Sequence, residues 1–256
     1  MNHEQPVALA LFPLHQSPAW RQGHGDDDFS AADRRRTPQN AMAEKSFTVR
    51  RLASNSRVEA GSWRAIRELC CRTGDNGRPV APQRWDFFPR IWVDPYEKLL
   101  PQWTYVAEAG GVVAYLTGCP NTKIFDRTRF FRCTLPLLVE IARGRYGRSP
   151  DARRFVRRAL GLEKQAESCF PFEIRRRMDR QYPAHLHINV DSAFRGVGIG
   201  RRLVGDFISD LRAIGAPGVH VYCGPDPLPF YRRLAFQELG STTFRGGTVH
   251  ALGFLC

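Results

Sequence analysis

The sequence has 256 residues, long enough for one domain with a full core or for two small ones. With 43% hydrophobic and 25% charged residues, its composition is ordinary for a globular protein. No stretch approaches the roughly 20 apolar residues of a membrane-spanning helix, and segment 7–12 lacks the basic start of a signal peptide. The formal net charge of +13 is compatible with an anionic ligand or a nucleic acid.

Seven cysteines are scattered along the chain, with no Cys-x-x-Cys spacing. The adjacent pair Cys70 and Cys71 suits neither a disulfide framework nor a metal site. An odd number without a pattern therefore predicts a reducing, cytoplasmic setting and no bound metal.

Residues 1–44 differ from the rest of the chain. They contain an acidic run at 26–28, a basic run at 34–36 and several prolines, and the first 41 show no periodic apolar residues. Such a composition predicts a disordered leader, and Met42 is an alternative start. We expect one folded domain over residues 45–256.

The segment 47–119 alternates between strand and helix patterns. Gly110 and Gly111 separate two strand patterns and are typical of a hairpin. The expected elements are a strand at 47–52, a helix at 62–71, a helical turn at 85–92, and strands at 103–108 and 112–119.

Residues 121–182 are expected to form a helical insertion. Sixteen Lys/Arg and seven Asp/Glu give it +9 of the chain's net charge of +13. The simplest interpretation is a solvated helical face that includes Arg153, Arg154, Arg157 and Arg158. A basic lid over an anionic ligand and nucleic-acid binding are the functional alternatives. Core-like spacing of the aromatic residues disfavours nucleic acid; these residues are Phe125, Phe130, Phe131, Phe155, Phe170 and Phe172.

A glycine-rich turn at 195–200 lies between a strand pattern at 185–190 and a helical pattern at 201–211. This layout aims unpaired backbone N–H groups and a helix N-terminus at one point, which favours a phosphate. Glycines matter there because a Cβ would keep the ligand away from the backbone. The turn therefore predicts a site for a pyrophosphate-bearing ligand.

Two common phosphate loops do not fit this turn. The Gly-x-Gly-x-x-Gly pattern of dinucleotide folds fails, because Arg201 stands where the third glycine belongs. No Gly-Lys-Ser/Thr follows, which excludes the phosphate loop of nucleoside triphosphatases. A purely structural glycine turn stays open as the alternative.

The turn does fit Arg/Gln-x-x-Gly-x-Gly/Ala, with Arg195, Gly198 and Gly200 in the fixed places. In this it resembles the acetyl-coenzyme A (acetyl-CoA) loop of the GCN5-related N-acetyltransferases, the GNAT family. The resemblance implies a mixed α/β fold: a mostly antiparallel central sheet with helices on both faces and a helical insertion before the cofactor-binding strand. It also implies that acetyl-CoA binds along the strand end and the turn, at Ile188, Asn189, Val190, Arg195, Gly196, Val197, Gly198, Ile199, Gly200 and Arg201.

The resemblance continues downstream with two departures. A strand pattern at 218–223 precedes a segment, 228–236, similar to the family's Phe-Tyr-x-x-x-Gly-Phe helix end. Family members usually carry Asn where this chain has Gly224, and Gly where it has Ala235. The missing Asn removes one expected polar contact to the cofactor. It makes a non-catalytic binding module the main rival to an enzyme.

Upstream, the chain is similar to a narrower group, the bacterial acetyltransferases related to the acetyltransferase-like domain of O-GlcNAcases. Four segments carry this similarity: 73–77, 94–96, 120–122 and 182–188. The whole resemblance covers residues 46–256 and specifies no substrate.

Acetyl transfer to an amine needs a proton acceptor for the amine and a proton donor for the leaving thiolate. The resemblance implies direct attack in a ternary complex, with the Tyr231 phenol as the acid; helix packing is its alternative role. His187 is expected opposite Ile188 and Val190 on its strand, facing the acceptor, and is the candidate base. A structural role for His187 and deprotonation through ordered water stay open. His185 shares its face, but the two histidines lack a third metal ligand.

Four aromatic residues precede or begin the second predicted strand: Trp85, Trp92, Tyr96 and Trp103. We expect them in the core, with an aromatic wall of the acceptor pocket as the second interpretation. Cys223, at the end of its strand, is expected to be a small buried residue rather than a nucleophile.

These patterns together predict an N-acetyltransferase that uses acetyl-CoA and a small-molecule or peptide amine. Nucleic-acid binding through the insertion is a weaker alternative, and no membrane association is expected. The oligomeric state is open, with a homodimer as one option.

Overall fold

A seven-stranded sheet forms the centre of the computed structural model, which describes residues 46–256 except 56, 76 and 148. The predicted leader, residues 1–44, and the alternative start at Met42 lie outside the described residues. The strands are β1 (Thr48–Arg51), β2 (Thr104–Glu108), β3 (Val112–Cys119), β4 (Ala184–Val190), β5 (Gly218–Cys223), β6 (Gln237–Phe244) and β7 (Gly247–Leu255).

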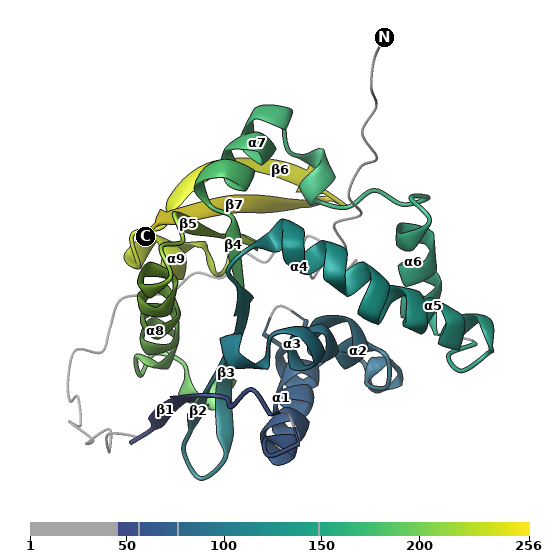
Figure 1. Cartoon of the computed structure of the whole chain (residues 1–256), viewed down its shortest axis with the longest axis horizontal. Helices are drawn as coiled ribbons and strands as arrows, with labels where there is room; N and C mark the ends of the chain where they lie inside the picture. The colour runs from purple at the N-terminus through teal and green to yellow at the C-terminus, as the bar shows by residue number, and fades with distance from the viewer. Residues whose placement is uncertain (1–45, 56, 76, 148) are drawn as a thin grey trace, which may run out of the picture.

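The strand order is β1-β2-β3-β4-β5-β7-β6, and β4 and β5 are the parallel neighbours in this otherwise antiparallel sheet (Figure 1). This arrangement confirms the predicted mixed fold class. The predicted hairpin is β2 and β3, with Gly110 in the left-handed region at φ 72°.

Helices cover both faces of the sheet, as predicted (Figure 1). On one face α8 (Ile199–Ala213) buries an apolar stripe against β2, β3 and β4, led by Leu203 and Phe207. On the other face α1 (Ala60–Thr73) buries Trp63 and Ile66. The remaining helices outside the insertion are α2 (Phe88–Trp92), α3 (Asp94–Leu99) and α9 (Leu228–Arg233), with 3-10 turns η1 (Pro82–Arg84), η2 (Pro101–Trp103) and η5 (Ser192–Phe194).

The insertion is helical, as its sequence predicts, and packs against the domain in two places. Its elements are α4 (Thr122–Arg129), the π-helical turn η3 (Phe130–Thr134), α5 (Leu135–Ala142), α6 (Pro150–Ala159), η4 (Glu167–Cys169) and α7 (Phe172–Gln181). Phe155 packs with Phe87 near α2, and Phe170 packs against β6 and β7.

Two expectations for the insertion are wrong in part. Phe131 and Phe172 are 60% and 63% exposed, so the spacing of the aromatic residues predicted more buried side chains than the structure has. Arg158 is buried, although Arg153 and Arg157 beside it are exposed. The reason is helical periodicity: Arg158 lies three residues after the core residue Phe155, on the inward side of α6.

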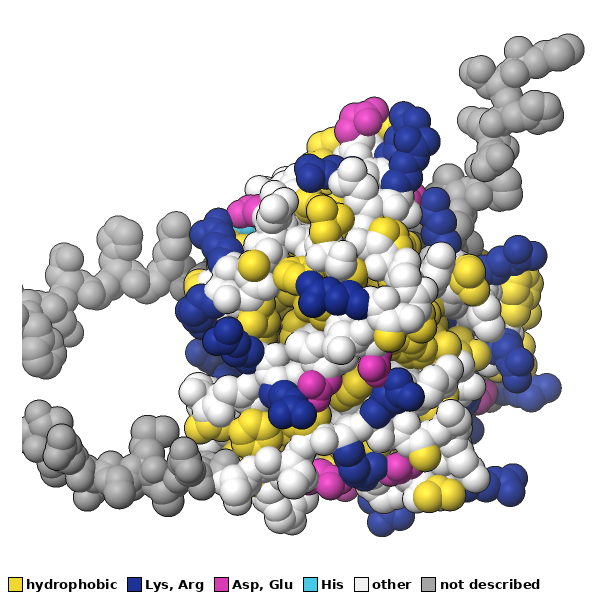
Figure 2. All heavy atoms as spheres, turned by 60° about the vertical axis from the view of Figure 1, so that its left-hand side comes forward, with side chains coloured by type: hydrophobic (Ala, Val, Ile, Leu, Met, Phe, Trp, Pro, Cys, Tyr) yellow, Lys and Arg dark blue, Asp and Glu magenta, His cyan; other side chains and the backbone are white. Residues whose placement is uncertain are grey.

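Surface charge is dispersed on the face drawn in Figure 2. There, Lys and Arg side chains alternate with hydrophobic and acidic ones and do not form one strip. In the part of the chain that the structure describes, we find no helix long and apolar enough to cross a lipid bilayer.

Candidate active site

The glycine turn after β4 adopts a backbone that favours glycine at two positions. Gly196 and Gly198 have φ angles of 81° and 90°, in the left-handed region. A Cβ built on either residue meets no heavy atom within 4 Å, so the space in front of the turn is open. Gly198 precedes α8, and no side chain caps this helix end. Unpaired N–H groups facing open space form an anion site.

The third glycine of the motif has a different role. Gly200 lies in the first turn of α8, and a Cβ there would lie 3.1 Å from the ring of Phe230. The missing side chain thus lets α8 approach α9. This contact brings the uncapped helix end close to the element that carries Tyr231.

The side chain of Arg195 holds two loops together. Its Nε donates to the carbonyl oxygen of Val190 at 3.3 Å, and its Nη2 donates to that of Gly77 at 3.0 Å. The backbone of Arg195 continues into the glycine turn. In this structure the guanidinium therefore connects the loop after α1 to the end of β4.

A cavity of about 860 Å³ opens where β4 and β5 separate. Their parallel pairing covers two residue pairs, Ala184 with Val219 and His185 with His220, although β4 continues to Val190 and β5 to Cys223. The sheet is split beyond that point. The volume is typical of a small-molecule site.

Most of the predicted cofactor residues line this cavity. They are Ile188, Asn189, Val190, Arg195, Gly196, Gly198, Ile199, Gly200 and Arg201. Val197 is the exception, because its side chain packs against the core on the α8 face. The open cradle in front of Gly196 and Gly198 fits a pyrophosphate, and the gap between the strands fits an extended chain attached to it.

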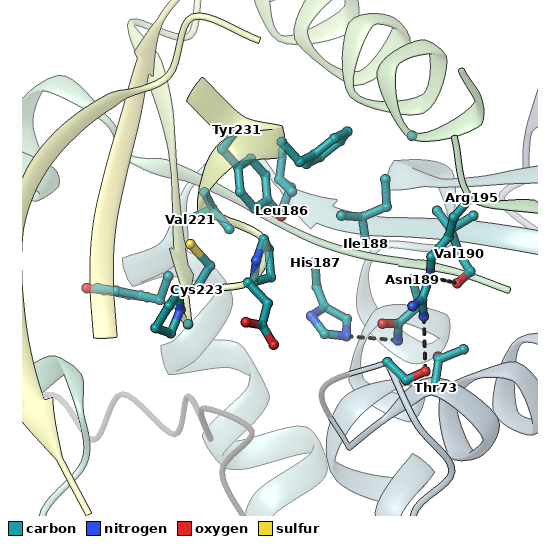
Figure 3. Close-up of a pocket in the computed structure, with 18 of the residues that line it drawn as sticks. Thr73, Leu186, His187, Ile188, Asn189, Val190, Arg195, Val221, Cys223 and Tyr231 are labelled. Atoms are coloured by element: carbon teal, nitrogen blue, oxygen red, sulfur yellow. Dashed lines mark hydrogen bonds between the residues drawn. The ribbon is translucent and has the colours of Figure 1, made fainter. Parts of the chain in front are cut away.

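Tyr231 enters the cavity from α9, on the side of Val221 and Leu186 (Figure 3). The residue is 5% exposed and packs edge-on against Phe230 and Phe236. Burial raises the pKa of its phenol, and the nearby Cys223 thiol adds to this shift. The phenol is therefore protonated at neutral pH and able to donate a proton.

His187 lies on the opposite face of β4 from Leu186 and Ile188, as its sequence position predicts (Figure 3). Its ring stacks on Trp92, with centroids 5.3 Å apart, and its Nε2 lies 3.4 Å from Nδ2 of Asn189. Burial lowers the pKa of His187 to about 4, so the imidazole is neutral at pH 7. A neutral imidazole can accept a proton.

Trp92 lines the acceptor side of the cavity, where it forms part of an aromatic wall, the second interpretation of the four aromatic residues. Tyr96 is a buried residue whose hydroxyl lies 2.8 Å from Nε2 of His185. Trp103 packs on Phe207 in the core, whereas Trp85 is 39% exposed. Two of the four aromatic residues, Trp92 and Tyr96, thus line the cavity, and the ring of Trp92 is stacked on a candidate catalytic group.

Two other candidates occupy structural positions. His185 is buried, and its Nδ1 lies 2.9 Å from Oγ1 of Thr122. Cys223 is buried, and burial raises the pKa of its thiol to about 12, which disfavours the nucleophilic thiolate. Within the described ranges there is no cluster of three or more His, Cys, Asp or Glu that could hold a metal ion.

One cavity residue, Glu167, had no signal in the sequence. It lies in η4, a short turn of the insertion, and lines the cavity together with His187 and Trp92. No motif surrounds it, and only the packing of the insertion against the sheet brings it there.

No family model matches the sequence. Among solved structures, the chain is similar to SsHAT, with 28% identity, a TM-score of 0.62, and coverage of 82% of this chain and 98% of SsHAT. It is also similar to PH1933 from Pyrococcus horikoshii OT3 (10% identity, TM-score 0.49, coverage 82% and 99%). A third match is an N-acetyltransferase from Staphylococcus aureus Mu50 (15% identity, TM-score 0.47, coverage 82% and 98%). The last two likenesses are too loose to support a conclusion.

The sheet with one split parallel pair, the uncapped helix after a glycine turn and the match along nearly all of SsHAT define the GNAT fold. In its fold the chain is similar to GNAT-type acetyltransferases. The narrower resemblance to O-GlcNAcase-related acetyltransferases is untested and stays a prediction.

Proposed function

We propose that the protein transfers the acetyl group of acetyl-CoA to an amine by direct attack in a ternary complex. One observation carries this proposal. The left-handed glycines and the uncapped end of α8 face open space at the mouth of a cavity that runs between β4 and β5. Backbone N–H groups bind the pyrophosphate there, and the pantetheine arm reaches between the two strands.

Tyr231 is the proposed acid. Its phenol lines the cavity, and its raised pKa keeps it protonated at neutral pH. As the carbon–sulfur bond of the thioester breaks, the phenol donates its proton to the leaving thiolate. The alternative, that Tyr231 only packs α9 against the sheet, predicts normal turnover without the hydroxyl.

His187 is the proposed base on the acceptor side. Its imidazole is neutral at pH 7 and can accept a proton from the amine directly or through a water molecule. The stacking of its ring on Trp92 fixes its orientation. The acceptor is a small molecule or a peptide with a free amine.

The experiment that tests this function is an acceptor screen with the purified full-length protein. Coenzyme A release is followed over alkyl amines, amino sugars, aminoglycosides and peptides, and acetyl-CoA binding is measured separately by calorimetry. Acetylation of any amine supports the proposal. Binding of acetyl-CoA without turnover favours the non-catalytic module, and absence of binding overturns the cofactor assignment.

A cytoplasmic location is part of this proposal. All seven cysteines of the chain are free thiols, including the neighbours Cys70 and Cys71. Free thiols are typical of a reducing compartment.

A further inference from the structure

Glu167 is a buried carboxylate on the wall of the active-site cavity. It is 8% exposed, and neither of its oxygens accepts a hydrogen bond from another residue. Within the described part of the chain, several buried polar side-chain atoms lack such a partner, and of their residues Glu167 is the one that lines this cavity. A buried carboxylate with no hydrogen-bond partner from another residue is costly, so its position calls for a ligand.

The turn that carries Glu167 is fixed from both sides. Its neighbours Ala166 and Phe170 are buried in a cluster with residues of β6 and β7. The hydroxyl of Thr242 in β6 donates to the carbonyl oxygen of Cys169 at 3.1 Å. The carboxylate is therefore held at the cavity wall by rigid elements, as a binding group needs to be.

Glu167 lies on the acceptor side of the split sheet. Along β5, Val221 and Cys223 face the α8 side, whereas Tyr222 packs with Phe170 and Met178 of the insertion. The Glu167 carboxylate acts electrostatically on Tyr222, which lines the same cavity. On β4, His187 faces that side too. The carboxylate thus lies across from the cofactor side of the site.

Burial has the largest effect on the pKa of Glu167, although charged neighbours act on it as well. Arg158 of α6 and Arg129 of α4 lower its pKa, and so does a hydrogen bond from its own main-chain N–H, whereas Asp126 raises it. Burial outweighs these effects and raises the pKa of Glu167 to about 8. An acid in this range can exchange protons with an amine near neutral pH.

We propose that Glu167 binds the ammonium group of the acceptor and takes its first proton, so that the acceptor is a cationic primary amine. This inference rests on the proposed acetyl transfer and specifies its substrate class. The bound cation supplies the charge and the hydrogen-bond donors that the carboxylate lacks. The rings of Trp92 and Tyr222 line the cavity for the body of the acceptor.

The ammonium gives one proton to Glu167, and the nitrogen lone pair forms a bond to the thioester carbonyl carbon. The carbon–sulfur bond then breaks, and the thiolate takes the proton of Tyr231. The nitrogen loses its second proton to the neutral imidazole of His187. The phenol regains a proton from solvent, and His187 and Glu167 release theirs when the product leaves.

The test compares Glu167→Gln with wild type in the full-length protein. Glu173→Gln is the matched control, because Glu173 is an exposed carboxylate of the same insertion. The probes are n-butylamine, 1,4-diaminobutane and 2-phenylethylamine, with 2-phenylethanol as the uncharged counterpart of the last. Binding to the protein with coenzyme A present is measured by calorimetry, and turnover is measured by thiol release.

We expect wild type and Glu173→Gln to bind the best amine at least about tenfold tighter than 2-phenylethanol, the counterpart that cannot carry an ammonium charge. Glu167→Gln should lose that preference while its acetyl-CoA Kd is unchanged. Its kcat/KM for the amine should fall by about 10²–10⁴. In wild type, kcat/KM should fall as the pH drops through about 8, where Glu167 takes up a proton. This limb of the pH profile should disappear in Glu167→Gln. Equal amine binding, or an unchanged pH profile, in Glu167→Gln overturns the inference.

Thermal stability separates a binding role from a structural one. A carboxyl group whose pKa is raised on folding lowers stability as pH rises from its unfolded pKa through its folded pKa, from about 4.5 to about 8. Glu167→Gln should therefore raise the Tm at pH 9 and change it little at pH 5. A lower Tm at pH 9 assigns Glu167 a structural role and overturns the proposal.

Failure of the proposed function gives a different result. If acetyl-CoA does not bind wild type, or if wild type acetylates no amine in the wider screen, acetyl transfer itself is in question. If wild type is active and Glu167→Gln matches it, only the carboxylate assignment fails.

Discussion

The two sides of the cavity are built from different parts of the chain. On the cofactor side, the predicted lining residues and three glycines come from one stretch of the chain, 188–201. On the acceptor side, the lining side chains Trp92, Glu167, His187 and Tyr222 come from four separate segments. The cofactor side thus comes from one stretch of the sequence, whereas tertiary packing assembles the acceptor side from distant segments.

This difference reflects what each side has to bind. A pyrophosphate is held by backbone N–H groups, which need glycines in left-handed conformations, and glycine leaves a visible pattern in the sequence. An acceptor is recognised by side chains, whose placement depends on tertiary packing. The following variants test whether the two sides are in fact separable.

The largest effect is expected for Tyr231→Phe, which belongs to neither side alone. The variant keeps the packed ring and removes the hydroxyl, so turnover should fall by about 10²–10⁴ with little change in the acetyl-CoA Kd. Steady-state kinetics on the best acceptor and calorimetry measure the two quantities. Tyr146→Phe, in the insertion, is the control. Wild-type turnover in Tyr231→Phe leaves only the packing role.

Gly198→Asp breaks the cofactor side. The φ of 90° is strained for Asp, and its carboxylate would lie in the open space expected for the pyrophosphate. Repulsion between the Asp carboxylate and the adjacent pyrophosphate should weaken acetyl-CoA binding by about 10²–10³-fold. Calorimetry measures the loss. Gly205→Asp makes the same chemical change at an exposed site of α8 and should bind normally; equal affinity of both variants contradicts the site.

His187→Gln tests the acceptor side, with an expected loss of about 10² in turnover at pH 7, the lower end for general-base catalysis. Since the wild-type imidazole must be neutral to act, activity should fall as pH drops through about 4, and this limb should vanish in the variant. His250→Gln, a histidine of β7 paired with Glu238, is the control.

The low-pH measurement needs a check on folding. A histidine whose pKa is lowered on folding, here from 6.5 to about 4, loses its contribution to stability as pH falls through that window. Circular dichroism at each pH separates unfolding from the kinetic limb. If folded His187→Gln keeps the wild-type limb, His187 is structural and another group is the base.

The fold was predictable where apolar and polar residues alternate along a strand and where a helix carries an apolar stripe. The expected strands at 112–119 and 218–223 match β3 and β5 to the residue, and the helix predicted at 201–211 lies within α8. The hairpin of β6 and β7 was missed. β6 is an edge strand of mostly polar residues, Gln-Glu-Leu-Gly-Ser-Thr-Thr-Phe, and its exposed positions give no apolar alternation.

The candidate site was predictable on its cofactor side and, on the acceptor side, at His187. Gly196 and Gly198 stand out in sequence because their conformation excludes most other residues. Glu167 does not, because a glutamate in a polar turn is usually exposed, and its burial arises from contacts made by Ala166 and Phe170 with distant strands. Its chemistry is therefore a property of the packed insertion.

Ala235→Gly examines a departure from the family pattern next to the site. Ala235 has a φ of 63°, where the family carries glycine, so it holds a conformation that costs a Cβ residue about 1 kcal/mol or more. After the entropy cost of glycine, the variant should gain about 0.5 kcal/mol of unfolding free energy. Chemical denaturation measures it. In the control Ala65→Gly, inside α1, the free energy of unfolding should fall by about 1 kcal/mol. A fall in both variants contradicts backbone strain at Ala235.

The smallest effect is expected for Arg153→Gln combined with Arg157→Gln, which tests whether the insertion also serves the cofactor side. Both arginines are exposed on α6. At 0.15 M salt the screening length is about 8 Å, so solvated charges farther than this from the pyrophosphate contribute little to its binding. The acetyl-CoA Kd should therefore change less than about twofold, and no more at 0.05 M salt. A large, salt-dependent loss would instead make the insertion a basic lid. Salt-dependent binding of duplex DNA, abolished by the same variant, would turn the interpretation toward nucleic acid.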